Sequence, residues 1–351
     1  MDTLTKPAPE AIRRAGVENP KTRARELAAQ LGVSEAETVA AWCGEGALRV
    51  APLPAGFLPR MEAVGEVLAL TRNESAVHEK VGVYDNFVAG KHASMMLGEA
   101  IDTRMFPAHW VHAFAVEKPD GDAVRRSLQI FDAQGDAVHK IHLRPASNVE
   151  AWQALVDGIA APDQSQSIEI AAAPEPDHAV DAAEPVEELR RRWSRMTDTH
   201  QFVGIIRKLK LSRRKAVHLV GEDYAWPLAV DAVETMMRQS ADAALPIMCF
   251  VGNRGCIQIH SGPIAAIKSM GPWLNVMDPT FHLHLRADRI REVWAVRKPT
   301  DKGHVTSLEA YDADGSLIIQ FFGKRIEGQD ERAGWRTIVE TLPRTARIQA
   351  A

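Results

Sequence analysis

Apolar and polar residues alternate along four short segments of the chain, and this period of two predicts β-strands. A polar turn signal separates the members of each pair, so each half of the chain is predicted to contain a β-hairpin. The strand segments are 127–131, 137–143, 307–311 and 317–322. The turn signals between them are Asp132–Gly135 and Asp312–Gly315.

Other segments carry the period of an amphipathic helix. A buried stripe is predicted for a helix that begins near residue 200, with Asp198 or Thr199 as its cap. The apolar residues of that stripe are Phe202, Ile205, Ile206 and Leu209. Each half also ends in a predicted helix, at 148–156 and 332–339.

The two halves repeat each other. The segment Phe114–Pro119 resembles Trp294–Pro299, and the paired lysines of these segments are separated by the same interval as the paired turn signals. Near the front of each half, Ser34 and Ser212 end similar segments at a slightly shorter interval, which a short insertion explains. We interpret the chain as a tandem duplication of one module.

The predicted fold class is α+β, because the hairpins of each module are joined to terminal helices. Residues 1–160 form the N-terminal repeat and residues 189–351 form the C-terminal repeat. Residues 161–188 between them are rich in Ala, Pro, Asp and Glu, which is typical of an acidic linker.

Composition indicates a globular protein with 46% hydrophobic and 25% charged residues. A net charge of −4 argues against a general binder of polyanions. The sequence shows no long apolar run and no apolar signal-peptide core, so we expect no membrane insertion. The three cysteines (Cys43, Cys249 and Cys256) are too few and scattered for a disulfide framework, which favours a reducing cytoplasm.

His200 distinguishes the second half from the first. Its counterpart is Pro20 in the register of the lysines, or Thr22 in the register of the serines, and neither can bind a metal as an imidazole does. On the same predicted helix face, Gly204 leaves room for a macrocycle and Arg207 can hold a carboxylate of haem. The alternative is a histidine that makes only a local hydrogen bond at a helix end.

Several motifs together resemble the HemS/ChuS/PhuS family of cytoplasmic haem-handling proteins from bacterial haem-uptake systems. The resemblance extends over nearly the whole chain, from Asn19 to Arg325. The segments that carry it are Thr197–Phe202, Ile101–Trp110, Val296–Pro299 and Gln320–Arg325. It implies two repeats, each with a large antiparallel sheet and packed helices, and one haem in a ligand cleft between the halves.

The resemblance also implies roles for single residues. His200 matches the axial ligand of the haem iron, and Arg104 matches a distal arginine that could orient a water or an oxygen species. The remaining matched residues are two aromatic pocket walls, Phe106 and Phe250, and three polar residues of the distal side and propionate region, Lys298, Gln320 and Arg325. One departure is Ile319, where the family often has Tyr.

The function implied is haem binding after import. The chain would pass haem to a haem oxygenase, open the ring itself with external electrons, or do both. A haem oxygenase and the cytoplasmic side of a haem transporter are the implied partners.

Two other classes of function compete with this one. The segment 24–42 has the pattern of a helix-turn-helix, and a basic run covers 208–215, so a haem-responsive or DNA-binding regulator is the main alternative. Glu35 and Glu37 stand on the would-be reading helix, where DNA requires donors and cations. Close histidine pairs such as His282 and His284 suggest zinc, but no cysteine or carboxylate completes a signature.

Overall fold

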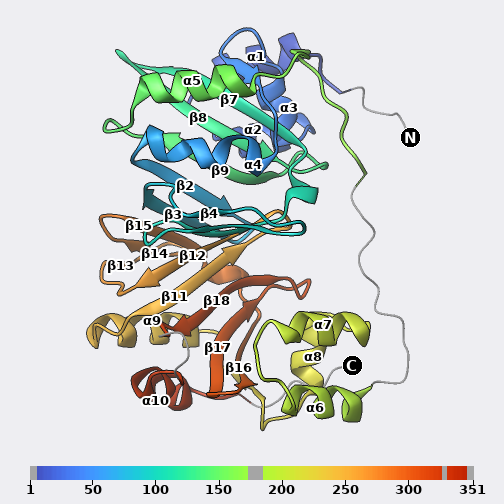
Figure 1. Ribbon diagram of the computed structural model, residues 1–351, viewed down its shortest axis with the longest axis vertical. Coiled ribbons are helices and arrows are strands. Elements are labelled where there is room, and N and C mark those ends of the chain that lie inside the picture. Colours follow the sequence, from blue (N-terminus) through green and yellow to red (C-terminus); the bar gives the residue numbers. More distant parts are fainter. Residues whose placement is uncertain (1–5, 173–184, 326–329, 346–351) are drawn as a thin grey trace. The chain divides into compact units, whose positions relative to one another are not determined.

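The structure, a computed structural model, describes residues 6–172, 185–325 and 330–345 (Figure 1). The predicted linker includes residues 173–184, which lie outside the described residues. The chain divides into two compact units. Residues 73–77 belong to the second unit and residues 252–258 to the first, so each half of the chain contributes one short segment to the other unit.

The helices of the first unit pack on antiparallel strands. Its elements are α1 (Pro9–Glu18), α2 (Ala24–Leu31), α3 (Glu35–Ala40), β1 (Ala47–Arg49), α4 (Pro54–Phe57), the 3-10 helix η1 (Leu58–Val64), β2 (Val67–Arg72), β3 (Ala76–Gly82), β4 (Phe87–Val88), β5 (Ser94–Leu97), β6 (Asp102–Met105), the 3-10 helix η2 (Pro107–His109), β7 (His112–Asp120), β8 (Ala123–Phe131), β9 (Ala137–Leu143) and α5 (Val149–Ile159). The strands follow the order β1-β7-β8-β9-β2-β3, and β6-β5-β4 form a second series. The pairings of β7 with β1 and β8, and of β9 with β8 and β2, are antiparallel.

Strand β7 shows that both faces of this sheet are covered. Ala113 and Ala115 belong to a core that includes residues of α4, η1 and α5. Phe114 and Val116 belong to a different core, which includes residues of α3. Because successive side chains of a strand point to opposite faces, α4 and α5 pack on one face and α3 on the other.

The second unit repeats this plan. Its elements are α6 (Val186–Ser194), α7 (Gln201–Lys208), α8 (Arg213–Leu219), β10 (Ala225–Leu228), α9 (Ala232–Asp242), β11 (Ile247–Gly252), β12 (Cys256–Gly262), β13 (Ile267–Met270), β14 (Trp273–Met277), β15 (Phe281–Arg286), the 3-10 helix η3 (Ala287–Arg289), β16 (Glu292–Thr300), β17 (Gly303–Tyr311), β18 (Leu317–Gly323) and α10 (Ala333–Thr341). The strands follow the order β10-β16-β17-β18-β11, and β15-β14-β13 form a second series. The pairings of β16 with β10 and β17, of β18 with β17 and β11, and of β14 with β13 and β15 are antiparallel.

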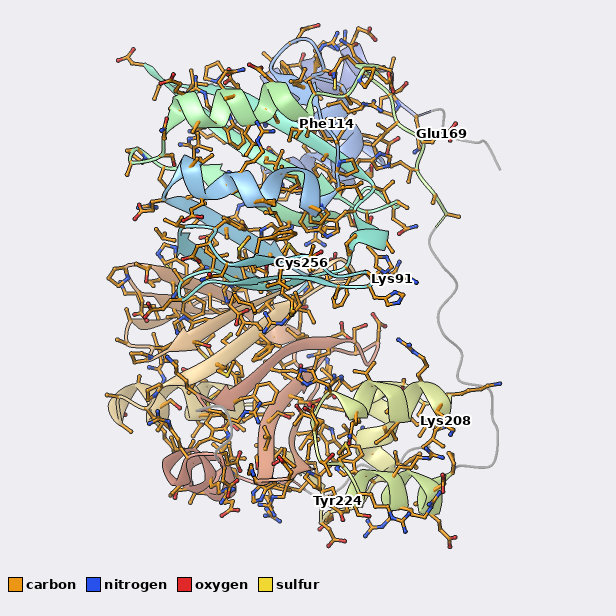
Figure 2. The ribbon with its side chains drawn as sticks, in the orientation of Figure 1. Lys91, Phe114, Glu169, Lys208, Tyr224 and Cys256 are labelled. Carbon is orange, nitrogen blue, oxygen red and sulfur yellow. The ribbon has the colours of Figure 1, made fainter. Side chains whose placement is uncertain are left out.

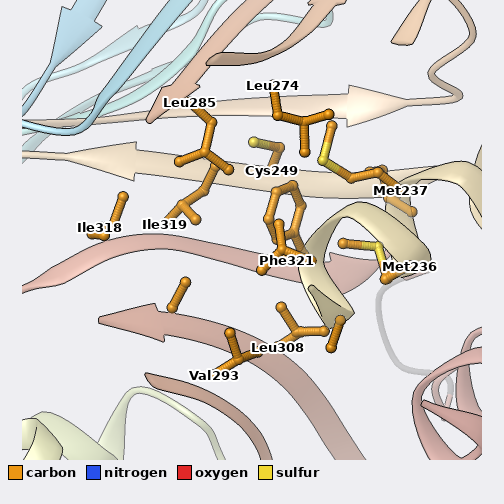
Figure 3. Close-up of a cluster of buried hydrophobic side chains, with 14 of the residues drawn as sticks. Met236, Met237, Cys249, Leu274, Leu285, Val293, Leu308, Ile318, Ile319 and Phe321 are labelled. Atoms are coloured by element: carbon orange, nitrogen blue, oxygen red, sulfur yellow. The ribbon is translucent and has the colours of Figure 1, made fainter. Parts of the chain in front are cut away.

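Strand β16 divides its side chains in the same way as β7. Val293 and Ala295 lie in the core that α9 and α10 cover, where Met236 and Met237 pack close to Phe321 (Figure 3). Trp294 and Val296 lie in the core beneath α6, α7 and α8. The two units therefore confirm the predicted α+β duplication with antiparallel sheets and packed helices.

The predicted hairpins are present, and their turns use the same chemistry. The side-chain oxygen Oδ1 of Asp132 accepts hydrogen bonds from two backbone N–H groups of its turn, and Oδ1 of Asp312 does the same. Gly135 and Gly315 close these turns with φ of 77° and 79°, a left-handed conformation that glycine adopts without strain. The local turn chemistry therefore accounts for both hairpins.

The helix ends decide how the repeats align at the front of each unit. Ser34 caps α3 and Ser212 caps α8, each by accepting from the backbone N–H three residues later. Just before them, Gly32 and Lys210 both have left-handed backbones, with φ of 65° and 53°. The serine caps and the left-handed residues before them match in the same alignment of the repeats. In this alignment Thr22 is the structural counterpart of His200.

The proposed reading helix of the helix-turn-helix, α3, is turned toward the sheet. Its first residue, Glu35, is buried and forms ion pairs with Arg72 and Lys140. On the matching helix α8, Arg213 and Arg214 bind buried glutamates. These side chains hold the helices on their sheets. Among the described helices, none is long and apolar enough to cross a membrane.

Glu292 is one of the two glutamates that hold α8. Its carboxylate accepts hydrogen bonds from Arg214 Nε at 3.0 Å, Trp294 Nε1 at 3.0 Å and His218 Nε2 at 2.6 Å. Burial by itself would raise the pKa of Glu292, but these hydrogen bonds outweigh it and bring the pKa from 4.5 to about 2. The charged form is thus strongly favoured in the folded state.

The lowered pKa of Glu292 predicts an acid-sensitive attachment of α8. The stabilisation is present above pH 4.5 and is lost as the pH falls toward 2, which corresponds to roughly 3 kcal/mol in total. Glu292→Gln should therefore lower the free energy of unfolding at pH 7 and flatten its decline between pH 5 and 2. Urea titrations followed by tryptophan fluorescence at several pH values measure both effects.

The matched control is Glu234→Gln, which removes an exposed carboxylate paired with Arg238. An exposed pair of this kind contributes about 0–1 kcal/mol, so this variant should follow the wild type. An unchanged pH profile for Glu292→Gln would show that Glu292 does not hold α8 through its charge.

Candidate functional site

The imidazole of His200 lies at the start of α7 and is 91% exposed. Oδ1 of Asp198 is 2.7 Å from Nδ1 of His200 and also accepts the backbone N–H of His200 at 2.7 Å. With the Nδ1 proton directed to this carboxylate, the lone pair of Nε2 faces solvent. Metal-binding histidines show this same arrangement, in which a carboxylate fixes the tautomer and the direction of the ring.

The predicted cap of α7 is wrong. His200 itself is the N-cap, and the helix begins at Gln201. Asp198 lies too early in the chain to cap the first turn, so its carboxylate binds the histidine. Hydrogen bonds from the backbone and then the side chain of His200 lower the pKa of Asp198, and the charge of Arg325 lowers it further. Arg325 is exposed, and because its charge acts on Asp198, it lies near His200.

The outer face of α7 is open beside the imidazole. Gly204 is exposed, and a Cβ atom placed on it would meet no other atom within 4 Å. Arg207 is exposed on the last turn of the same helix, next to Lys208, which is labelled in Figure 2. A flat molecule bound to His200 would thus meet a clear surface with cations beyond it.

The inner face of α7 is firmly packed. Phe202 and Ile205 are buried in the core shared with α6 and α8. The guanidinium of Arg213 lies 4.9 Å from the centre of the Phe202 ring, and Nζ of Lys298 lies 4.8 Å from it. Two cations on one ring fix the helix that carries His200.

Both of those cations are bound by Glu309, a fully buried residue of β17. The Glu309 carboxylate accepts hydrogen bonds from five side chains on β16, β17, β18 and α8. They are Lys298 at 3.0 Å, Gln320 at 2.9 Å, Ser307 at 2.9 Å, Tyr311 at 2.5 Å and Arg213 at 3.2 Å. Burial would raise the pKa of Glu309, but Lys298 and then Arg213 hold it far below its usual value.

The structure thus brings Lys298 and Gln320 together at one carboxylate. Lys298 is only 4% exposed and lies beneath Phe202, so its ammonium is part of the anchor of α7. Gln320 is partly buried, and its backbone lies opposite Phe250 in the β11–β18 pairing. Ile319, where the family often has Tyr, is buried in the core on the other face of the sheet.

Phe250 has an aromatic partner that the sequence analysis did not identify. Its ring lies 5.0 Å from the ring of Phe322, edge to face. Phe322 stands two residues after Gln320, so both project from the same face of β18. That spacing is the signal that could have identified Phe322.

Arg104 and Phe106 belong to the first unit. Arg104 is on β6 and forms an ion pair with Asp102, and its side chain is 32% exposed. Burial raises the pKa of Asp102 although Arg104 opposes that shift. Phe106 is half-buried, and its backbone N–H donates to the carbonyl of Gly255 at 2.9 Å.

Sequence reasoning missed two residues that organise the site. The sequence predicts Asp198 only as a cap, although an aspartate side chain commonly binds the backbone N–H two residues later, here that of His200. Glu309 has no predicted role, although it stands between the apolar residues Leu308 and Ala310 of its strand. A charged residue at such a place in a buried sheet requires partners.

Comparisons with known proteins agree with this architecture. The family model described as "Haemin-degrading HemS.ChuX domain" matches residues 32–159 and 210–342. The chain is 38% identical over 332 residues to the "Hemin transport protein HmuS" of Yersinia pestis, which covers 93% of this chain and 95% of that protein.

Solved structures give the same result. Holo-PhuS, a heme-binding protein from Pseudomonas aeruginosa, matches with a TM-score of 0.93 and 40% identity, covering 96% of this chain and 98% of that chain. ChuS, an E. coli heme oxygenase, matches with a TM-score of 0.86 and 34% identity, covering 94% and 99%.

Proposed function

Because the chain belongs to the HemS/ChuX family of haemin-degrading proteins, we propose that it handles haem in the cytoplasm and binds the iron through His200. Its relatives include a hemin transport protein, a heme-binding protein and a heme oxygenase, which supports trafficking or degradation of haem. The observation that carries the proposal is the pairing of the exposed His200 imidazole with the Asp198 carboxylate.

The residues around His200 fit a haem. The ring of the macrocycle requires space beside the imidazole, and the open position at Gly204 supplies it. The two propionates require cations, and Arg207 and Arg325 are exposed on this side. Bound haem would supply iron for axial coordination and, with external electrons and an oxidant, the ring that is opened.

The chain's own side chains have distinct tasks in this proposal. Asp198 holds the Nδ1 proton, which keeps Nε2 available as a ligand and raises its basicity. Lys298, Gln320 and Glu309 keep α7 in place. Phe250 supplies an apolar wall, and Phe106 is assigned the same task in the first unit.

Arg104 is assigned the distal side, where its guanidinium would donate a hydrogen bond to a water or an oxygen species. Asp102 fixes the direction of that side chain through its ion pair. The haem is then transferred to a haem oxygenase, or its ring is opened on this protein. We assign the cytoplasmic side of a haem transporter as the source of the haem.

The experiment that separates these two activities starts from protein without haem. Hemin is titrated in, a reductant is added, and the Soret band is followed with and without catalase. Persistence of the Soret band under reductant indicates trafficking. Loss of the band only without catalase indicates breakdown driven by free peroxide, and loss in both conditions indicates ring opening by the protein.

His200→Ala should weaken hemin binding by at least about 100-fold and shift the Soret and visible bands, because the axial ligand is removed. Asp198→Ala should keep the ligand but release its ring, with a loss of about 10- to 100-fold. The control is His92→Ala, which removes an exposed imidazole from the first unit. Wild-type spectra and affinity in His200→Ala would contradict the assignment.

Hemin titration should saturate at one haem per chain. Thr22 occupies the position in the first unit that His200 occupies in the second, and its hydroxyl cannot replace an imidazole on iron. The absorbance change at the Soret maximum, plotted against added hemin, gives the stoichiometry. Two equal and independent tight sites would overturn this interpretation of the duplication.

Arg104→Ala should alter the spin state or slow reductant-dependent loss of the Soret band more than it weakens binding. A charged hydrogen bond contributes about 1.5–3 kcal/mol, so hemin affinity should fall by no more than about one to two orders of magnitude. Asp102→Asn is the control, since it removes the ion pair and keeps the guanidinium. If Asp102→Asn reproduces every effect, Arg104 acts only through the ion pair.

A further inference from the structure

A cavity of about 270 Å³ opens inside the first unit, between the helices α1–α3 and strand β7. Its walls are mainly apolar and include Ile12, Leu27, Val39 and Val116, and the partly buried indole of Trp42. None of its lining residues is among those assigned to haem above. A volume below about 300 Å³ is smaller than the usual pocket for a drug-sized ligand, so a macrocycle does not fit.

The second unit fills the matching position with aromatic side chains. Helices α1 and α6 share the sequence pattern Glu-x-Ile/Leu-Arg-Arg. When the repeats are aligned on this pattern, the buried Ile12 corresponds to Leu189, and Gly16 corresponds to Trp193. In the alignment that matches Ser34 with Ser212, Ala24 corresponds to Phe202. In the second unit the rings of Trp193 and Phe202 meet at 5.0 Å, edge to face.

A third aromatic residue completes the filling of the second unit. Tyr224, labelled in Figure 2, lies with its ring 6.3 Å from that of Trp193. In the register of the two serines its counterpart is Gly46. All three counterparts, Gly16, Ala24 and Gly46, line the cavity of the first unit. The cavity is therefore lined by small residues at three positions where the duplicated unit carries aromatic side chains.

One polar group of the filled site is retained at the cavity. In the second unit, Nζ of Lys298 lies 4.8 Å from the centre of the Phe202 ring. The matching residue of the first unit is Lys118, which lines the cavity on β7. Ala24 places no ring beneath this ammonium, so a ring supplied by a ligand would restore the cation–π contact.

From these observations we infer that the first unit binds a small, neutral, electron-rich planar aromatic molecule of one or two fused rings. Its ring takes the place that Phe202 and Trp193 occupy in the second unit, between the apolar walls and the ammonium of Lys118. A preformed apolar cavity of about 150 Å³ is enough to bind an aromatic molecule such as benzene. This site is independent of the haem proposed at His200.

Indole is the probe, with cyclohexanol as an apolar molecule that has no π face. Saturation-transfer NMR and calorimetry should detect indole with a Kd of about 1 mM or below, and cyclohexanol should bind more weakly. Ala24→Phe places the ring of the second unit in the cavity and should abolish indole binding. Ala29→Phe adds the same ring on the exposed side of α2 and should leave binding unchanged.

Two further variants keep the test decisive if Ala24→Phe does not fold. Gly16→Leu enters the cavity from α1, where an added Cβ has ordinary contacts of 3.7 Å to Trp42 and 3.8 Å to Leu27, and it should block indole. Lys118→Ala should weaken indole about two- to fivefold by removing the cation. Hemin titration of each variant should remain as in the wild type.

No detectable indole binding to the wild-type protein would overturn the inference. Binding that survives both Ala24→Phe and Gly16→Leu would place the aromatic site elsewhere. Indole affinity that is the same in Lys118→Ala, or cyclohexanol binding as tight as indole, would show that the ring is not held beneath an ammonium. Competition of indole with hemin for one site would also contradict the proposal.

Discussion

The second unit depends on one buried carboxylate, that of Glu309. It binds Lys298 and Gln320 from the neighbouring strands and Arg213 from α8, and the two cations enclose the ring of Phe202. Removing one partner from a buried ion pair typically costs about 3–5 kcal/mol, because the remaining charge has no partner. The helix layer that presents His200 is therefore attached to the sheet electrostatically as well as by apolar packing.

In the first unit the helix layer is also attached to its sheet by a buried ion pair, but the charges are reversed. There the helix supplies the carboxylate of Glu35, and the strand supplies Lys140, whose Nζ lies 2.5 Å from it. In the alignment of the repeats, Glu35 matches Arg213 and Lys140 matches Gln320, so the geometry of the duplicated module is kept while the charge of the helix is reversed. A helix layer anchored in either way remains in contact with its sheet.

The two units differ in what fills the space beneath that layer. In the second unit the aromatic rings of Trp193 and Phe202 occupy it and tie α7 down. That leaves the outer face of α7, with His200 and Gly204, open to a ligand. In the first unit small residues stand at the matching positions, and an interior cavity results. The duplicated units therefore differ in shape, with an open outer face of α7 in one and a cavity beneath the helices in the other.

The sequence alone determined the hairpins, the duplication and the asymmetry at His200, because turn chemistry and side-chain period are local properties of the chain. The α+β class followed from these local patterns, and the family followed from the resemblance of four motifs. Only the tertiary structure decided that Lys298 and Gln320 converge on Glu309, that Asp198 orients His200, and that residues 73–77 and 252–258 exchange units. A polar residue in a strand has the same local pattern whether it faces water or a buried partner. Its role depends on strands and helices far apart in sequence, whose register and packing no local pattern specifies.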